Sequence, residues 1–178
     1  DYLFVYPHGT EAGAPNARYI ATDALAKNLP IRVYPNSYVR ARAMITGGVA
    51  TTSPFGVALF CRKDAEAYTK VIDVFNGTSF SLYGAGVNPE IPSSLTPTSN
   101  RLCGANCVTG AMIRDQSSTF TVPALTTGQN IEIDTVVRVN LTPGSTGNCR
   151  YQKDDGTVFD AYTNTPTFIA DELAAGGM

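Results

Sequence analysis

The sequence predicts an all-β fold, an antiparallel β-sandwich with one or two short helices and an immunoglobulin-like or jelly-roll-like arrangement. Composition is the first reason, because charged residues make up only 16% of the 178 residues, against about 25% in an average domain. Thr, Ser, Asn and Gly fill the difference, with 16 Gly and 11 Pro in the chain. The second reason is the alternation of apolar and polar residues along several segments, which is typical of strands with one buried face.

The segment from Gln129 to Thr142 shows this alternation most clearly. The residues expected to face the core are Ile131, Ile133, Val137, Val139 and Leu141. The residues expected on the other face are Glu132, Asp134, Arg138 and Asn140. Because a sheet of an antiparallel sandwich packs on one face and meets water on the other, the second set is predicted to be exposed.

Other segments give weaker strand signals. Val39 to Ile45 alternates, Val57 to Cys61 is a short continuous apolar run, and Asp154-Asp155-Gly156 marks the turn of a hairpin. That hairpin would join Cys149–Lys153 to Thr157–Tyr162. Further strands are expected at Tyr2–Tyr6, Ile31–Tyr34, Lys70–Phe75, Ser79–Tyr83, Val108–Ile113, Ser118–Val122 and Pro166–Ile169. The short helices are expected among Thr22–Asn28, Arg62–Thr69 and Glu172–Ala175.

Four cysteines, Cys61, Cys103, Cys107 and Cys149, indicate two disulfides in an exported chain. Three pairings are possible, and the favoured one joins Cys103 to Cys107 and Cys61 to Cys149. The short loop can close because Gly104 and Asn106 accept unusual backbone angles. Zinc is the alternative for Cys103 and Cys107, but no second pair has matching spacing, so no metal is expected.

The length predicts a single domain over residues 1–173, with 174–178 as a small-residue tail that could begin a linker. The cysteines and a start at Asp1 without methionine favour an exported, extracellular protein. No apolar run reaches the roughly 20 residues of a membrane span, so no membrane insertion is expected. A net charge of −2 with scattered basic residues argues against nucleic acid as a partner.

The sequence offers little sign of catalysis. His8 is the only histidine and has no nucleophile at a recognisable spacing, and Gly-x-Ser-x-Gly is absent. Three pairs of carboxylates lie close together in the sequence: Glu132 with Asp134, Asp154 with Asp155, and Asp171 with Glu172. The first pair falls on an expected exposed strand face, the second in a turn and the third near the end of the chain. We therefore expect no enzyme activity and no cofactor.

A long irregular stretch from Gly84 to Cys107 is the predicted binding loop. It is rich in Pro, Gly, Ser and Thr, and the cysteine pair would hold its end in place. Tyr and Arg supply contact area and charge-assisted bonds, and Asn supplies paired donors and acceptors. The predicted ligand-binding residues are Tyr83, Asn88, Asn100, Arg101 and Asn106.

The chain starts without methionine, has four cysteines, low charge and Thr/Asn/Gly-rich strands, and ends in Leu173-Ala174-Ala175-Gly176-Gly177-Met178. Together these features resemble the receptor-binding domain of a bacterial chaperone–usher pilus tip adhesin. The resemblance spans the chain in overall character, and no motif transfers a particular binding residue. It implies a β-sandwich on the cell surface that grips a host glycan or extracellular glycoprotein without catalysis. It also implies a following pilin domain and pilus subunits as partners.

Two other classes fit the same composition. A viral capsid or spike jelly roll shares the strand content and the lack of catalytic residues. A secreted glycoside hydrolase would need two carboxylates that converge in a cleft.

Overall fold

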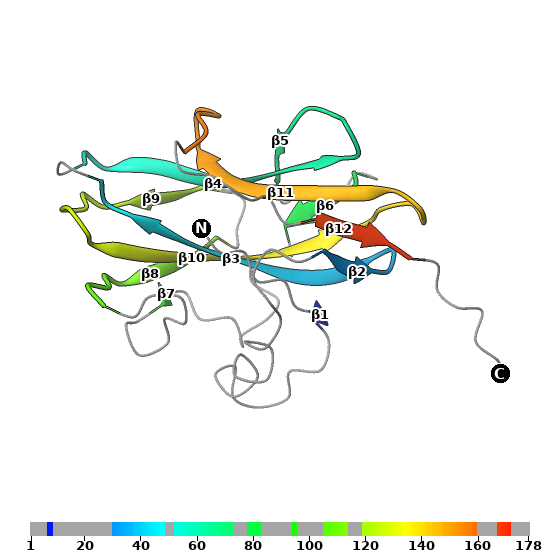
Figure 1. Ribbon diagram of the computed structural model, residues 1–178, viewed down its shortest axis with the longest axis horizontal. Coiled ribbons are helices and arrows are strands. Elements are labelled where there is room, and N and C mark those ends of the chain that lie inside the picture. The colour runs from blue at the N-terminus through cyan, green and yellow to red at the C-terminus, as the bar shows by residue number, and fades with distance from the viewer. Residues whose placement is uncertain are drawn as a thin grey trace.

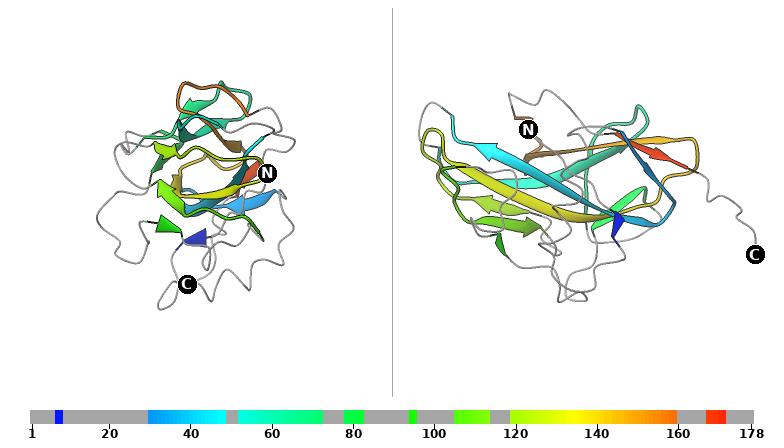
Figure 2. Two further views of the ribbon diagram at one scale, coloured as in Figure 1. Left: turned by 90° about the vertical axis from the view of Figure 1, so that its left-hand side faces the viewer. Right: turned by 60° about the horizontal axis from the view of Figure 1, so that its bottom comes forward.

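The computed structural model describes residues 7–8, 30–48, 52–72, 78–82, 94–95, 105–113, 119–159 and 167–171. Every regular element within these residues is a strand, which confirms the all-β prediction. The strands form two six-stranded sheets. Figure 1 shows β4 and β11 running above β3 and β10, and Figure 2 shows the two layers from further directions. None of the described residues forms a helix of the length and apolar character that a membrane crossing requires.

The first sheet has the order β1-β3-β10-β8-β7, and β6 also pairs with β10. Its strands are β1 (Pro7–His8), β3 (Ser37–Thr46), β6 (Phe80–Leu82), β7 (Ser94–Leu95), β8 (Gly110–Ile113) and β10 (Asn130–Val139). The long antiparallel pair of β3 and β10 forms its centre. β8 runs parallel to β10, so the sheet is not wholly antiparallel.

The second sheet has the order β2-β12-β11-β4-β5, and β9 also pairs with β4. Its strands are β2 (Ile31–Val33), β4 (Phe55–Lys63), β5 (Thr69–Lys70), β9 (Phe120–Val122), β11 (Thr146–Lys153) and β12 (Thr167–Ala170). β4 and β11 are its antiparallel centre, and β2 runs parallel to β12.

The core lies between the two sheets. The inward face of β10 is confirmed, because Ile131, Ile133, Val137 and Val139 are all fully buried. β4 and β11 contribute Val57, Leu59 and Tyr151 from the opposite layer. Period-two alternation along β10 accounts for its inward face, whereas the middle of β4 is buried on both faces.

The outward face of β10 does not meet water as predicted. Glu132 and Asp134 are fully buried, and Arg138 and Asn140 are half-buried. The sheet is therefore covered on both faces along this strand, a feature that alternation alone does not reveal. In register, Asp134 lies opposite residue 42 of β3.

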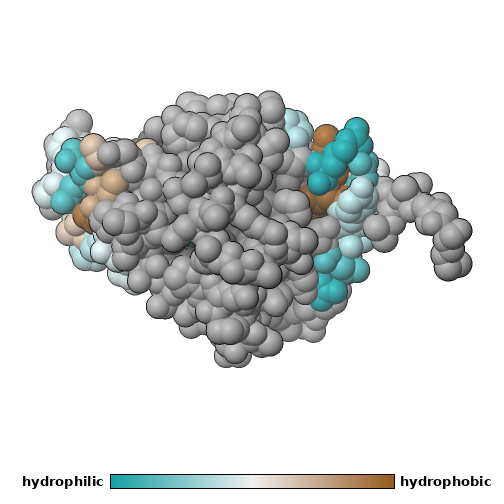
Figure 3. Space-filling model, turned by 90° about the horizontal axis from the view of Figure 1, so that it is seen from below, coloured by the Kyte–Doolittle hydropathy of each residue, from teal (hydrophilic) through white to brown (hydrophobic). Residues whose placement is uncertain are grey.

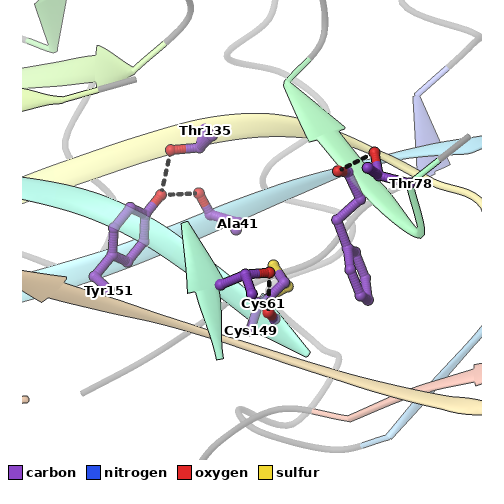
Figure 4. Close-up of a disulfide and its surroundings, with 8 residues drawn as sticks. Ala41, Cys61, Thr78, Thr135, Cys149 and Tyr151 are labelled. Atoms are coloured by element: carbon purple, nitrogen blue, oxygen red, sulfur yellow. Dashed lines mark hydrogen bonds between the residues drawn. A yellow bond between two sulfur atoms is a disulfide. The ribbon is translucent and has the colours of Figure 1, made fainter. Parts of the chain in front are cut away.

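One predicted disulfide is confirmed. Cys61 on β4 and Cys149 on β11 lie directly opposite each other with a Cα–Cα distance of 4.1 Å, and they are bonded (Figure 4). Cys107 is also disulfide-bonded, and its partner lies outside the described residues. The predicted pairing of Cys103 with Cys107 stays a prediction.

Three other predictions are corrected. A helix at Arg62–Thr69 is wrong, because β4 continues through Lys63 and a turn follows at 64–66. The hairpin partner after Gly156 does not form a strand over 157–159, and β11 pairs with β4 and β12 instead. The stretch from Gly84 to Cys107 is not wholly irregular, because β7 lies within it. The helices predicted at Thr22–Asn28 and Glu172–Ala175 lie outside the described residues, as does the tail 174–178.

Candidate functional site

A groove of about 390 Å³ opens at one end of the sandwich, where β3 ends and β4 begins. This volume lies within the range of pockets that take small ligands, roughly 300 to 1,000 Å³. Seen from below, the described surface at the left-hand end of the molecule carries hydrophobic and hydrophilic residues side by side (Figure 3). The groove is lined by Ile45, Thr46, Thr52, Ser53, Pro54, Phe55, Lys153, Thr157, Val158 and Phe159.

Two aromatic rings provide the apolar part of the groove. Phe55 begins β4 and Phe159 follows the turn after β11, and their ring centroids lie 6.0 Å apart with an interplanar angle of 61°. This edge-to-face geometry is a favourable one for aromatic pairs. Val158 adds an apolar side chain that is 37% exposed. The groove therefore offers a ligand a hydrophobic surface that is open to solvent.

The turn after β11 positions one wall of the groove. The amide of Gly156 donates to the carbonyl of Lys153 at 2.8 Å, and the amide of Lys153 donates to the carbonyl of Thr157 at 2.9 Å. Gly156 has a φ of 89°, which L side chains rarely adopt. This pattern of a tight turn followed by a left-handed glycine is a common hairpin connection. The predicted Asp-Gly turn is thus confirmed, although the described residues that follow it directly, 157–159, form no strand.

Asp154 fixes this turn to the rest of the sheet. Its carboxylate accepts hydrogen bonds from the Lys70 ammonium and from the Thr119 hydroxyl, the latter at 2.9 Å. Its amide donates to the carbonyl of Gly56 at 2.9 Å. The hydrogen bond from Lys70, and next that from Thr119, lower the pKa of Asp154 below its usual value. The wall that carries Lys153 is therefore held by both main-chain and charged contacts.

Threonine hydroxyls shape the opposite wall. The Thr52 hydroxyl accepts a hydrogen bond from the Leu125 amide at 3.0 Å, which leaves its proton free to be donated to a ligand. The Thr46 hydroxyl donates to the Asn130 side-chain oxygen at 2.7 Å, which leaves its lone pairs as acceptors. The Ser53 and Thr157 side chains are exposed at the rim. Hydroxyl donors and acceptors therefore flank the aromatic rings.

Lys153 supplies the one cationic side chain of the lining. Its ammonium lies 5.7 Å from the centroid of the Phe55 ring, within reach of a cation–π interaction. Within the described residues the Lys153 ammonium makes no side-chain hydrogen bond or ion pair. The ammonium is thus available to an acceptor group on a ligand.

Of the predicted binding residues, only Asn106 is described. It is exposed with a φ of 53°, and its carbonyl accepts a hydrogen bond from the Asn130 amide at 2.9 Å. Asn130 is also the partner of Thr46, so Asn106 lies at the same end of the sandwich as the groove. Tyr83, Asn88, Asn100 and Arg101 lie outside the described residues.

The carboxylate pairs considered for catalysis do not converge in the groove. None of the described members, Glu132, Asp134, Asp154, Asp155 and Asp171, lines it. Asp155 accepts a hydrogen bond from the Thr157 amide, which lowers its pKa, and a general acid needs a raised pKa instead. Asp171 is paired with Arg32. Glu172 lies outside the described residues.

Within the described ranges, no three His, Cys, Asp or Glu side chains gather in a way that could hold a metal ion. His8 lies on β1, and its side chain is not among those described.

Comparison of the chain with protein families, with curated proteins and with solved structures finds no match. A functional assignment therefore depends on the chemistry of the groove itself.

The groove is the part of the site that sequence reasoning missed. Its lining comes from three segments, 45–46, 52–55 and 153–159, that only the fold brings together. The available signal was the Asp-Gly turn with aromatic and hydroxyl residues after it. By itself, a turn signal of this kind indicates a connection and not a binding site.

Proposed function

We propose that this chain is a non-catalytic, extracellular adhesion domain that binds a host glycan or extracellular glycoprotein through the groove. The mixed lining carries this proposal. Phe55 and Phe159 offer rings on which the apolar face of a sugar can pack, and the threonine hydroxyls can exchange hydrogen bonds with sugar hydroxyls. A pilus adhesin would use a site of this kind, with a pilin domain and pilus subunits as further partners.

One feature supports an exported protein, and another supports binding over hydrolysis. The Cys61–Cys149 disulfide belongs to an oxidising compartment. The carboxylates of the described residues are engaged in structural contacts or lie away from the groove, which favours binding over hydrolysis. Among the described residues, no pair of carboxylates lines the groove as the glycoside hydrolase alternative would require.

The test is binding of the oxidised 178-residue chain to an array of glycans and extracellular proteins. We expect selective binding that Val158→Ser and Lys153→Gln each weaken by about fivefold or more. Ile72→Ser is the matched control, because Ile72 is an exposed aliphatic side chain, 49% exposed, outside the groove lining. It should leave the affinity within about twofold.

Two results would contradict the proposal. One is binding that the groove variants and the control affect equally. The other is an absence of binding together with higher-order particles on size-exclusion chromatography, which would favour the capsid alternative.

A further inference from the structure

Two guanidinium groups lie against one tyrosine ring on the outer face of the second sheet. The Cζ of Arg150 is 3.9 Å from the centroid of the Tyr68 ring, and the Cζ of Arg62 is 4.7 Å from it. Arg62 is on β4, Arg150 is on β11, and Tyr68 directly precedes β5. Two strands of the second sheet and the residue before a third therefore contribute to one cluster, which we call the arginine–tyrosine cluster.

The register places this cluster away from the core. Cys61 and Cys149 face the core, so their neighbours Arg62 and Arg150 face outward, because alternate residues of a strand point to opposite faces. Phe60 is directly opposite Arg150 on the same face and is only 9% exposed. The burial of Phe60 does not account for two like charges on one ring.

Neither arginine is neutralised by an acid within the described ranges. The guanidinium of Arg32, in the same sheet, is bonded to both carboxylate oxygens of Asp171, at 2.6 and 2.8 Å. Arg62 and Arg150 have no such partner among the described residues, and the buried Nε of Arg62 has no hydrogen-bond partner there. The Nε of Arg150 can donate to the Gln152 carboxamide oxygen at 3.1 Å. The terminal nitrogens of both groups remain available as donors.

A planar guanidinium matches the oxygens of sulfate, phosphate or carboxylate with two parallel N–H···O bonds. Stacking on a ring holds that plane in place, so less side-chain entropy is lost when an anion binds. Both guanidinium groups lie against the same ring, with Cζ atoms 3.9 and 4.7 Å from its centroid, so the two charges are close together. Such a pair suits a ligand with repeated negative groups better than a single ion. A sulfated polysaccharide has this character.

We propose that the arginine–tyrosine cluster is an anion-binding site for the sulfate groups of a sulfated glycan, separate from the groove. Arg62 and Arg150 hold the sulfate oxygens, and Tyr68 orients both guanidinium groups. The choice of a glycan as the carrier of the charges rests on the proposed adhesive function, whereas the affinity for anions does not.

The experiment measures binding of the oxidised full chain to heparin by isothermal titration calorimetry. N-acetylated, fully desulfated heparin and hyaluronate serve as polysaccharides that keep carboxylates but lack sulfate. We expect binding to heparin alone, with Arg62→Gln and Arg150→Gln each weakening it at least about fivefold and the double variant abolishing it. Tyr68→Leu, which removes the aromatic ring but keeps an apolar side chain, should weaken binding by less than either arginine variant.

Arg32→Gln is the matched control for net charge. It removes the same formal charge from the same sheet, but the guanidinium of Arg32 is already paired with Asp171. It should change the affinity for heparin less than about twofold. If a glutamine variant does not fold by near-ultraviolet circular dichroism, Arg62→Lys and Arg150→Lys keep the charge and should still weaken binding, because lysine cannot form the two parallel bonds.

Several outcomes would overturn this assignment. One is an absence of heparin binding. Another is an affinity for heparin that the double variant leaves unchanged, and a third is binding of hyaluronate as tight as that of heparin. The two proposals can fail separately. Val158→Ser should leave heparin binding unchanged, and Arg150→Gln should leave unchanged the binding of the ligand that the array identifies for the groove.

Discussion

The Tyr151 hydroxyl donates a hydrogen bond of 2.9 Å to the main-chain carbonyl of Ala41, and this contact joins the two sheets through the middle of the core (Figure 4). The Thr135 hydroxyl lies 2.7 Å from the same oxygen and can donate to it. All three residues are fully buried, so water cannot replace a lost partner. The tyrosine thereby links β11 of one sheet to β3 and β10 of the other.

Tyr151→Phe should therefore lower the free energy of unfolding by about 1–3 kcal/mol, because a buried Thr135 hydroxyl loses its partner. Urea denaturation of the oxidised chain measures the difference. Thr135→Val provides the second arm of a double-mutant cycle, and the two losses should not add because they remove one shared contact. Additive losses would show that the two hydroxyls are not coupled.

Removing the confirmed disulfide should be more costly. The bond spans 88 residues of sequence, and the chain-entropy treatment gives a stabilisation of about 4–5 kcal/mol for a loop of that length. The double variant Cys61→Ala with Cys149→Ala should lose an amount of this order in urea denaturation, while the Cys107 bond is kept intact. A loss below about 1 kcal/mol would contradict the expectation.

The contacts of Asp154 predict a change of stability with pH. Lys70 and then Thr119 lower the pKa of this carboxyl from its usual 3.8. A lowered pKa means that the stabilisation is complete above the unfolded value and is lost as the pH falls through the folded value. Because the Asp154 side chain is 43% exposed, the effect should be small, about 0.5–1 kcal/mol.

Asp154→Asn should therefore destabilise the protein at pH 7 and match the unmodified chain once the pH is below the folded pKa. Thermal unfolding between pH 2 and pH 7 measures this convergence. A stability difference that stays constant across the range would show that the charge of Asp154 is not the cause.

Gly47 and Gly48 form a matched pair for substitution next to the groove. A Cβ on Gly47 would lie 2.3 Å from the carbonyl oxygen of Thr126, whereas a Cβ on Gly48 would meet nothing within 4 Å. Gly47→Ala should lower the free energy of unfolding by about 1–3 kcal/mol, because the main chain must shift. Gly48→Ala, the control, should change it by less than about 0.5 kcal/mol. Equal effects of the two substitutions would contradict the predicted clash.

Much of the strand content could be predicted from the sequence, because side chains along a strand alternate with a period of two. Alternation predicts the long strands β3 and β10 and the inward face of Ile131 and Ile133, whereas a continuous apolar run predicts β4. Alternation separates two faces but does not tell how many layers cover a sheet. For that reason the burial of Glu132 and Asp134 could not be predicted.

The groove could not be predicted for a different reason. Phe55 and Phe159 are about a hundred positions apart in the chain, and nothing local indicates that their rings meet. The disulfide between Cys61 and Cys149 was predictable because four cysteines allow only three pairings. Asn106, the one predicted binding residue that the structure describes, lies at the same end of the sandwich as the groove.

The position of the Cys61–Cys149 bond has a mechanical consequence. The groove contains Phe55 at the start of β4 and Lys153 at the end of β11, and these two strands are hydrogen-bonded neighbours. A pulling force on anything seated in the groove is therefore transmitted into this pair of strands. The strands can peel apart from the groove end only as far as the cysteines, where rupture would have to break a covalent bond. The disulfide thus limits the separation of β4 from β11 under force to the segment between the groove and the two cysteines.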